Sequence, residues 1–516
     1  TIQAGGLLTN TNQHVAFNRM MSREASIGID GVYYNPAGVV FMNEGHHLAI
    51  NWQLAYQTRS IKNDYALFPN NVNNPITPRT FKGKAFAPVI PSFQYAYNKG
   101  RWSLQAGFAL TGGGGKCTFD NGLGSFEKIV AETAIAACQL AGAVDQVASQ
   151  YGVPAVFSSD KYFGKEGKYS YNSYMHGRQY YYGLSLGAAY KINEHLSAYA
   201  GVRGVYASTN YYGYVEDIKV GNMPLYKVLD PTKENAANIE LSCDQTGVGF
   251  TPIIGVDYKT GRWNFSAKYE FKTRIRLKNK SVNQAPSIGN LPANLSNQMT
   301  GILTAKYQQA GLTLEQAKQQ AENKANAVLT DPTVGATMMG LKTQFDQKLN
   351  KAIGEYEDGK KIAGDIPGYL ALGIGYSPVD AVRVNVGFHW FDDKHATSYN
   401  NRQEKLKRGT LEYNAGVEVD VNKKITLSTG WQNTNYGLSD EYMDDKSFVV
   451  SSNSVAVGGV YHINKKMDLN VAYFHTFYQH KKTSETVQLA ADKSIVYNSD
   501  YTRNNNVFAV GLDINF

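Results

Sequence analysis

Residues able to do chemistry are scattered along this chain and form no catalytic pattern. His46 and His47 are adjacent, as are Asp392 and Asp393, and neighbouring residues of a strand point to opposite faces. Neither pair is therefore expected to hold one metal ion. Phosphate-loop, Gly-x-Ser-x-Gly and dinucleotide motifs are also missing from any strand-to-helix context. The sequence predicts a protein that is not an enzyme and has no metal or other cofactor.

Two charged groups remain as candidates. An acidic group in one connection lacks the regular spacing of a calcium loop, so we expect solvated carboxylates, with a bound cation as the alternative; its members are Asp440, Glu441, Asp444 and Asp445. A cationic group is expected on the polar, inward face of the barrel strands described below: Lys268, Lys272, Arg274 and Arg276 on one strand, with Arg383 and Arg203 on others. These cations could bind a ligand carboxylate. We favour the other interpretation, in which they pair with Glu270, Glu418 and carboxylates of a segment packed inside the barrel.

Composition limits the class of protein. Charged residues make up only 18% of the 516 residues, whereas there are 36 Tyr and 49 Gly, as suits a sheet with aromatic girdles. The net charge of +8 is spread along the chain, which excludes a concentrated nucleic-acid-binding patch. The chain has no run of about 18 apolar residues, so no membrane-spanning helix is expected. It begins at Thr1 without a basic and apolar leader, as in a processed mature form.

The three cysteines, Cys117, Cys138 and Cys243, are widely spaced. They match no zinc or redox motif. A bridge between Cys117 and Cys138 and three free thiols are the alternatives, and free thiols are favoured.

Alternation with period two is the strongest pattern. At the end of the chain Phe508, Val510, Leu512, Ile514 and Phe516 alternate with small or polar residues. The same alternation recurs over residues 48–57, 263–272 and 382–390. Many of these runs reach the nine to eleven residues that a tilted strand needs to cross a bilayer. The pattern predicts strands with an apolar outer face and a polar inner face.

Connection lengths predict topology and orientation. Short turns near residues 98–100, 193–194, 259–261, 378–380, 422–423 and 464–465 alternate with long connections. Short periplasmic turns and long extracellular loops are typical of outer-membrane barrels. We therefore predict an all-β, transmembrane antiparallel β-barrel of about 14 strands over residues 46–516. Two of its extracellular loops should carry helical inserts, at about 126–151 and 301–356, because both are rich in strong helix formers.

Residues 1–45 do not alternate and are rich in Gly, Asn and Ser. A barrel this wide leaves an interior that its wall side chains do not fill. We predict that this segment is a hatch, or plug, inside the lumen.

The hatch segment carries a resemblance. A stretch of small residues (24–28), then Asp30, then Tyr-Asn-Pro-Ala-Gly just before the first strand is similar to the FadL family of outer-membrane transporters of long-chain fatty acids and other hydrophobic compounds. Residues 91–97, residues 255–258 and the Phe-terminated last strand extend the resemblance over the barrel. The insert at 301–356 lies outside it.

The resemblance implies a hatch-gated barrel that takes up a hydrophobic ligand and releases it sideways through a kinked third strand. Asn35, Pro36, Ala37 and Gly38 are the hatch motif. Gly112, Gly113, Gly114 and Gly115 follow the expected third strand and could break its pairing, although a flexible loop start is the favoured interpretation.

The resulting hypothesis is passive transport in the Gram-negative outer membrane, with a fatty acid or similar ligand, outer-membrane lipids and lipopolysaccharide as partners. The alternative is an accessory barrel of a larger secretion or insertion complex. In that case the lumen would be sealed and other outer-membrane proteins would dock on the loops.

Overall fold

The computed structural model describes residues 6–490 and 492–516, and its strands close into one antiparallel barrel. Eleven strands are uninterrupted in the described chain: β1 (Gly45–Tyr65), β2 (Arg79–Lys99), β3 (Trp102–Phe119), β4 (Tyr169–Lys191), β5 (Leu196–Val220), β7 (Ile239–Thr260), β12 (Val382–Phe391), β13 (Thr410–Asn422), β14 (Ile425–Asn435), β15 (Ser452–Asn464) and β18 (Lys493–Asn515).

Three further strands are each interrupted once. They are β8 (Trp263–Glu270) with β9 (Arg276–Gln284), β10 (Lys361–Ala363) with β11 (Tyr369–Val379), and β16 (Met467–Tyr478) with β17 (Lys481–Ala490). A two-residue piece, β6 (Met223–Pro224), pairs only with the end of β5. The barrel of the described chain therefore has fourteen strands, and pairing of β18 with β1 closes it. This confirms the predicted fold class and strand number.

Burial along the strands is inverted relative to a soluble protein. On β1, Asn51 and Gln53 are 2% and 1% exposed, whereas Ile50 and Trp52 are 43% and 42% exposed. The last strand repeats this, with Phe508 52% exposed. An apolar outer surface around a polar interior requires lipid outside the wall, so this is a membrane-spanning barrel.

The strands continue well beyond the lipid-facing band. Outward residues of β1 are apolar up to Tyr56 and then become Thr58, Ser60 and Lys62. A strand of 21 residues such as β1 is about twice as long as a bilayer requires. The long connections predicted at 61–88, 111–176, 216–246, 277–366 and 481–504 were consequently too long, because residues at their ends belong to strands that extend past the membrane. Those predicted at 392–409 and 435–451 match the observed connections closely.

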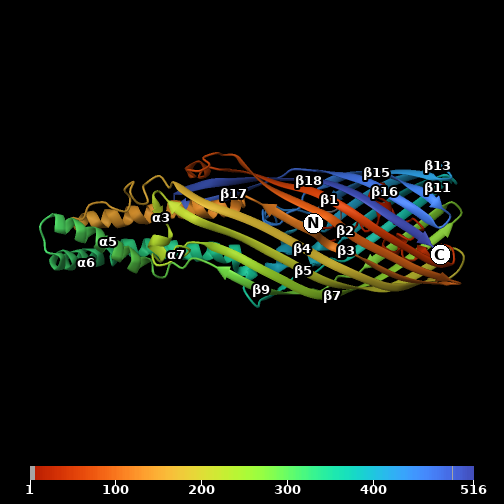
Figure 1. Cartoon of the computed structure of the whole chain (residues 1–516), viewed down its shortest axis with the longest axis horizontal. Helices are drawn as coiled ribbons and strands as arrows, with labels where there is room; N and C mark the ends of the chain where they lie inside the picture. The colour runs from red at the N-terminus through yellow and green to blue at the C-terminus, as the bar shows by residue number, and fades with distance from the viewer. Residues whose placement is uncertain (1–5, 491) are drawn as a thin grey trace.

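The two ends of the barrel differ (Figure 1). One end, here called the turn end, carries the six predicted tight turns and the C-terminus. The other, the loop end, carries helices that project beyond the strands: α3 (Gly124–Gln150), α4 (Tyr226–Leu229), α5 (Leu291–Gln309), α6 (Leu314–Leu329) and α7 (Pro332–Ile353). Short 3-10 turns lie at η2 (Phe68–Asn70), η3 (Gly354–Tyr356), η4 (Asp393–His395) and η5 (Tyr399–Lys405). Both predicted helical inserts are present, and the second begins ten residues earlier than expected.

In the described residues no helix has the length and apolar character needed to cross a membrane.

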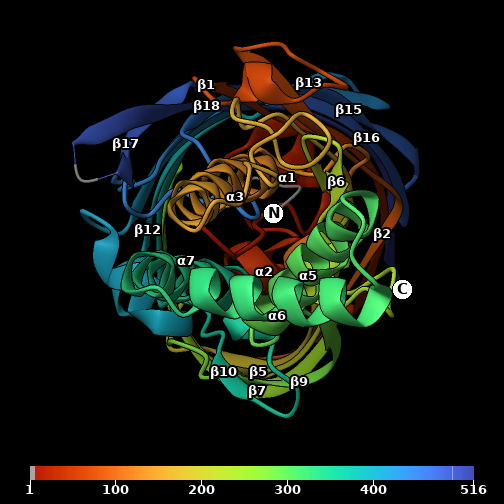
Figure 2. The same cartoon turned by 90° about the vertical axis from the view of Figure 1, so that its left-hand side faces the viewer.

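The segment before β1 lies inside the barrel (Figure 2). It contains α1 (Val15–Met20), α2 (Gly31–Tyr34) and η1 (Gly38–Phe41), and we call residues 6–44 the hatch. Inward glycines of the wall allow the close approach: a Cβ at Gly430 would lie 1.7 Å from the carbonyl oxygen of Met20. The hatch fills the lumen towards the turn end.

Candidate functional site

Buried ion pairs fasten the hatch to the wall. His389 of β12 lies between the hatch and a neighbouring strand, with Nε2 2.5 Å from Glu24 and Nδ1 2.8 Å from Glu412. All three side chains are at most 1% exposed. Removing one partner of such a buried pair typically costs about 3–5 kcal/mol, so this contact holds the hatch firmly.

Two of the predicted inward cations belong to these fastenings. Lys268 donates to the carbonyl oxygen of Tyr33 in the hatch at 2.5 Å and to Glu270 at 2.9 Å. Arg383 donates to Glu418 at 2.7 Å, and Glu418 in turn pairs with Arg19 of the hatch. Both cations are therefore positioned to hold the hatch.

Arg203 joins the first of these groups. Its guanidinium donates two hydrogen bonds to Glu270, at 2.6 and 3.0 Å. The same carboxylate thus accepts from Lys268 and Arg203, which leaves little of its capacity for a ligand.

The Asn-Pro-Ala-Gly motif attaches the hatch to three strands near the turn end. Asn35 donates to Asp257 of β7 at 2.6 Å. The carbonyl oxygens of Pro36 and Ala37 accept from side chains of β3 and β5, at 2.7 and 2.6 Å. Gly38 donates its backbone N–H to the Asn35 side chain, and a Cβ there would overlap that side chain. The motif therefore anchors the hatch to the barrel wall.

The pairing of β2 with β3 is interrupted. These strands pair at Phe93↔Phe108 and again at Phe86↔Lys116, but residues 87–92 of β2 and 109–115 of β3 do not pair with each other. We call this break the wall gap. Gly113, Gly114 and Gly115 have positive φ values of 72°, 119° and 89°, a conformation that suits glycine. Together with Gly112 they lie within β3. The favoured interpretation of this stretch as the start of a loop was therefore wrong.

A short part of the hatch lies against the inner side of the wall gap. The backbone N–H of Asn10 donates to Thr111 at 2.9 Å, and its side chain donates to the Gly113 carbonyl oxygen at 2.9 Å. On the other side Ser92 donates to the Gln13 carbonyl oxygen at 2.7 Å. Residues 9–13, here called the gate segment, therefore bridge the two separated strands.

Some buried polar atoms of the gate segment lack hydrogen-bond partners. Thr9 Oγ1, Asn10 Oδ1 and Asn12 Oδ1 are buried without a hydrogen-bond partner among the described residues. A buried unpaired polar atom costs about 1–3 kcal/mol. The observed position of residues 9–13 is thus less stable than their many hydrogen bonds suggest.

The solved structures that resemble this chain share its architecture. No protein-family model and no curated protein matches the chain. Among solved structures, a Pseudomonas aeruginosa FadL homologue superposes with a TM-score of 0.59 over 99% of this chain and 100% of that chain, at 13% identity. The chain has the FadL fold. A TodX mutant described as a monoaromatic hydrocarbon channel matches with a TM-score of 0.50 at 13% identity, over 98% and 99% of the two chains.

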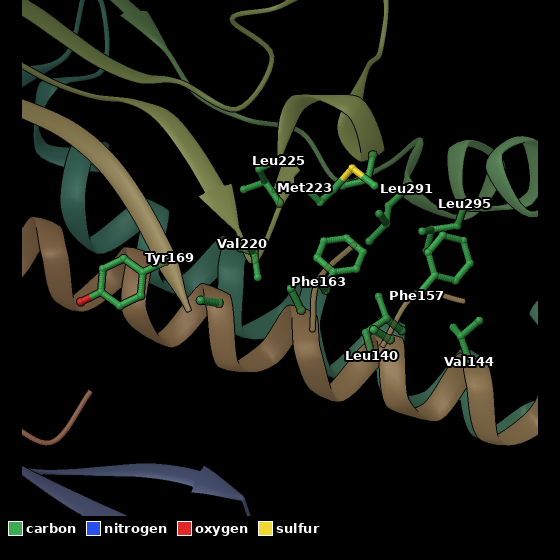
Figure 3. Close-up of a cluster of buried hydrophobic side chains, with 14 of the residues drawn as sticks. Leu140, Val144, Phe157, Phe163, Tyr169, Val220, Met223, Leu225, Leu291 and Leu295 are labelled. Carbon is green, nitrogen blue, oxygen red and sulfur yellow. The ribbon is translucent and has the colours of Figure 1, made fainter. Parts of the chain in front are cut away.

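Three cavities lie between the loop end of this FadL-fold barrel and the interrupted pairing of β2 with β3. The cap cavity has about 600 Å³ of empty space, which, like the volumes of the two cavities below, includes space open to solvent. It is lined by α3, α4, α5 and α7, including Leu140, Val144, Leu291, Leu295, Leu341 and Phe345. Figure 3 shows Leu140 and Val144 on α3, facing Leu291 and Leu295 across Phe157 and Phe163.

A second cavity lies nearer the barrel along the same two helices. This mouth cavity, with about 540 Å³ of empty space, is lined by Phe126 and Ile129 of α3 and by Ala352 and Ile353 of α7. Ile129 and Leu140 are eleven residues apart, which corresponds to about 17 Å along a helix. The helices α3 and α7 therefore line both cavities.

The third cavity reaches the wall gap. This gap cavity has about 500 Å³ of empty space, is lined by Gly113, Gly114 and Gly115, and shares Met175, Tyr211 and Lys446 with the mouth cavity. Two cationic side chains, Arg59 and Lys446, also line it. An apolar space that ends beside cations suits an amphiphile with an anionic head.

The turn end is chemically different. Its vestibule is lined by charged and polar side chains: Arg19, Arg383, Glu418, Asp420, His462, Asp468 and Asp513. Arg19 belongs to the hatch, so the hatch separates this polar vestibule from the apolar cluster above it, which includes Phe17, Tyr33, Ile90 and Leu110.

The expectation that one strand face carries four inward cations was wrong for two of them. Lys268 is 3% exposed, but Arg274 and Arg276 are exposed on the outside. The strand is interrupted between β8 and β9, and the inward residues change there from even to odd numbers, as at Thr273 and Ile275. Such an irregularity reverses the direction of every later side chain.

Lys272 lies within this interruption and is also partly exposed. Its ammonium donates to the carbonyl oxygen of His395 at 3.0 Å. It therefore contacts a loop and neither the hatch nor any of the three cavities. The cysteines Cys117, Cys138 and Cys243 are all free.

Sequence analysis missed the gate segment and the cations of the gap cavity. Residues 9–13 are five consecutive polar residues that become at most 4% exposed. Such a run just before a helix was a detectable signal. Arg59 and Lys446 gave no signal, because 387 positions separate them and only the closed barrel brings them together.

Proposed function

We propose that this protein lies in a Gram-negative outer membrane and takes up hydrophobic compounds by passive diffusion. The ligand enters the cap cavity from outside, follows α3 and α7 to the mouth cavity, and reaches the gap cavity. It leaves sideways through the wall gap into the membrane when the gate segment moves. The turn end faces the periplasm, since short periplasmic turns are typical of such barrels.

One observation supports this proposal most strongly: the gap cavity, lined by Gly113, Gly114 and Gly115, lies where β2 and β3 do not pair. Ile90 and Leu110 border the gap and belong to the buried apolar cluster of the lumen. Beyond the hatch the vestibule is charged. Lateral release keeps an apolar molecule in apolar surroundings, whereas axial release would force it through water.

The cargo class that fits best is a long-chain fatty acid. The route is apolar over the cap and mouth cavities and ends beside Arg59 and Lys446. A carboxylate can form charge-assisted hydrogen bonds with these cations, whereas a neutral hydrocarbon would gain nothing from them. The aromatic compounds named for TodX and similar channels are the alternative cargo.

The other role considered, an accessory barrel that docks partner proteins on its loops, is less well supported. The helices at the loop end bury their apolar faces in one cluster that includes Leu295, Leu303 and Val334. Among the described residues of α3 and α5–α7, only Leu314 and Met339 are exposed large hydrophobic side chains. This surface offers no extensive apolar patch for a partner.

The test is to map the path with a photoreactive ligand. The purified barrel in lipid vesicles is irradiated with a diazirine-bearing long-chain fatty acid, and the labelled residues are identified by mass spectrometry. We expect labels on residues 87–92 and 109–115 and on the cap cavity. Labels in the vestibule, for instance on residues 422–424, without labels at the gap would overturn lateral release.

A neutral diazirine-bearing aromatic hydrocarbon serves as the matched probe for the cargo class. If the fatty acid competes with its own probe far better than toluene does, the cargo is a fatty acid. If toluene competes better, the proposed cargo is wrong while the lateral route stands.

A further inference from the structure

Exposed cations of β9 form a row that the proposed ligand route does not use. Arg274, Arg276, Lys278 and Lys280 are alternate residues, and all four are exposed. Alternate residues leave the same face of a strand, about 7 Å apart, so the row covers about 20 Å of the outer wall. On the neighbouring strand, Lys361 lies directly opposite Lys278.

This row crosses the edge of the lipid-facing band. On the adjacent β7, Val248 and Phe250 are 64% and 70% exposed and face outward. The next outward residue towards the loop end is Thr246, which pairs with Lys278. Lys278 therefore lies at the level where apolar surface gives way to polar surface, which is where lipid headgroups are located. Lys280 lies beyond it, and Arg276 and Arg274 lie on the side of Val248 and Phe250.

The charge of the row is largely uncompensated. Arg276 pairs with Asp365 at 2.8 Å. Asp244 lies opposite Lys280 but accepts a hydrogen bond from Asn210 instead. Among the described residues, four of the cations have no carboxylate within ion-pair distance: Arg274, Lys278, Lys280 and Lys361. Like charges directly opposite each other destabilise a sheet, and an anion bound outside the wall would relieve that repulsion.

We propose that this cationic row binds the phosphate groups of a phosphorylated lipid of the outer leaflet, of the lipid A type. Lys and Arg form strong charge-assisted hydrogen bonds with phosphate, and basic clusters beside a membrane recognise anionic headgroups. The acyl chains of the same lipid would pack on Val248 and Phe250. This inference rests on the outer-membrane location proposed above, but not on the cargo or its route.

Binding is tested with the full-length barrel in a zwitterionic detergent. Wild type and a variant with Arg274→Gln, Lys278→Gln, Lys280→Gln and Lys361→Gln are titrated with lipid A, and hydrogen–deuterium exchange locates the contact. Loss of charge-assisted bonds worth about 1.4 kcal/mol or more should weaken binding at least about tenfold. Residues 271–284 and 358–366 should be protected in wild type alone, and less so at high salt.

Matched controls separate this site from general basic attraction. A variant with Lys423→Gln, Lys424→Gln, Lys465→Gln and Lys466→Gln removes the same charge at the turn end and should bind like wild type. Arg substitutions at Lys278 and Lys280 should preserve binding. Unchanged mobility on unheated gels verifies that each barrel is intact.

Three results would overturn the proposal. The four-residue variant could bind lipid A like wild type, dephosphorylated lipid A could bind equally well, or inorganic phosphate alone could give the same protection. The last result would indicate a small-anion site. Uptake measured on the same variant keeps the two proposals apart, because lost lipid binding with normal transport would leave the transport route intact.

Discussion

At the residue scale, the account depends on where a few charged side chains point. Lys268 and Arg274 lie six positions apart with the same parity, yet one is buried against the hatch and the other is exposed outside. Alternation alone predicts that both face inward. The interruption at residues 271–275 reverses the later side chains, and it depends on contacts such as Phe271 N–H with Pro252 O at 3.0 Å. Sequence alternation could not reveal that contact.

Arg59 provides the first prediction. If it binds the ligand carboxylate, Arg59→Met should weaken binding of a long-chain fatty acid about tenfold or more, because a charged hydrogen bond contributes about 1.5–3 kcal/mol. Binding of a neutral alkane should change little. Fluorescence titration of both ligands measures this difference. Equal loss for both ligands would show that Arg59 acts through packing and not through its charge.

Asp445 provides a pH prediction. It accepts hydrogen bonds from Ser125 N–H and Oγ, both at 2.8 Å, at the start of α3. Burial, together with the neighbouring charge of Asp444, raises the pKa of Asp445 from 3.8 to about 6. The folded state therefore binds this proton more tightly than the unfolded chain. The stabilisation that protonated Asp445 contributes to the folded state should be full below about pH 4, decrease between pH 4 and 6, and stay lost above pH 6.

Thermal unfolding in detergent between pH 4 and 7 checks this sign. Asp445→Asn cannot titrate, so its Tm should rise relative to wild type as the pH increases from 4 to 6. The exposed Asp440→Asn variant removes the same charge and should stay parallel to wild type. Parallel curves for Asp445→Asn as well would contradict the assignment.

At the element scale, sequence patterns predicted the presence and number of strands better than the positions of their ends. Alternation and turn residues identified fourteen strands and the six tight turns. The strand ends at the loop side were missed because outward residues there, such as Lys62 and Lys84, are polar. Beyond the lipid, a two-sided polar strand has no hydrophobic pattern to detect. The helices, in contrast, were predicted from strong helix formers alone.

The prediction for the kinked strand β3 concerns a substitution of Gly113. Its φ is 72°, and a Cβ there would lie 2.3 Å from the carbonyl oxygen of Gln179. Gly113→Ala should therefore shift β3 and alter the wall gap, at a cost of about 1–3 kcal/mol, and slow fatty-acid uptake into vesicles. Gly142→Ala in α3, which has open space around it, is the matched control. Wild-type uptake by an intact Gly113→Ala barrel would contradict a role of the kink in release.

At the scale of the whole molecule, the barrel divides into an apolar route and a polar barrier. Composition and alternation predicted the wall and the plug, because lipid outside and a wide lumen inside impose both. The position of the opening depends on which wall strands fail to pair, and on residues 9–13 lying across them. Those are long-range contacts with no local sequence pattern. The fastening points near Glu24 are separate from the gate segment, and the proposed route requires the gate segment to move while the rest of the hatch stays bound.

Locking the gate segment tests the central claim most directly. Gln13→Cys and Ser92→Cys are introduced after replacement of the three native cysteines by Ser, since Ser92 Oγ lies 2.7 Å from the Gln13 carbonyl oxygen. Uptake of radiolabelled long-chain fatty acid into vesicles is then measured before and after reduction, beside each single-cysteine variant. The account predicts that the oxidised pair blocks uptake and that reduction restores it, with the single variants unaffected. Uptake at the wild-type rate through a fully oxidised lock would contradict release through the wall gap.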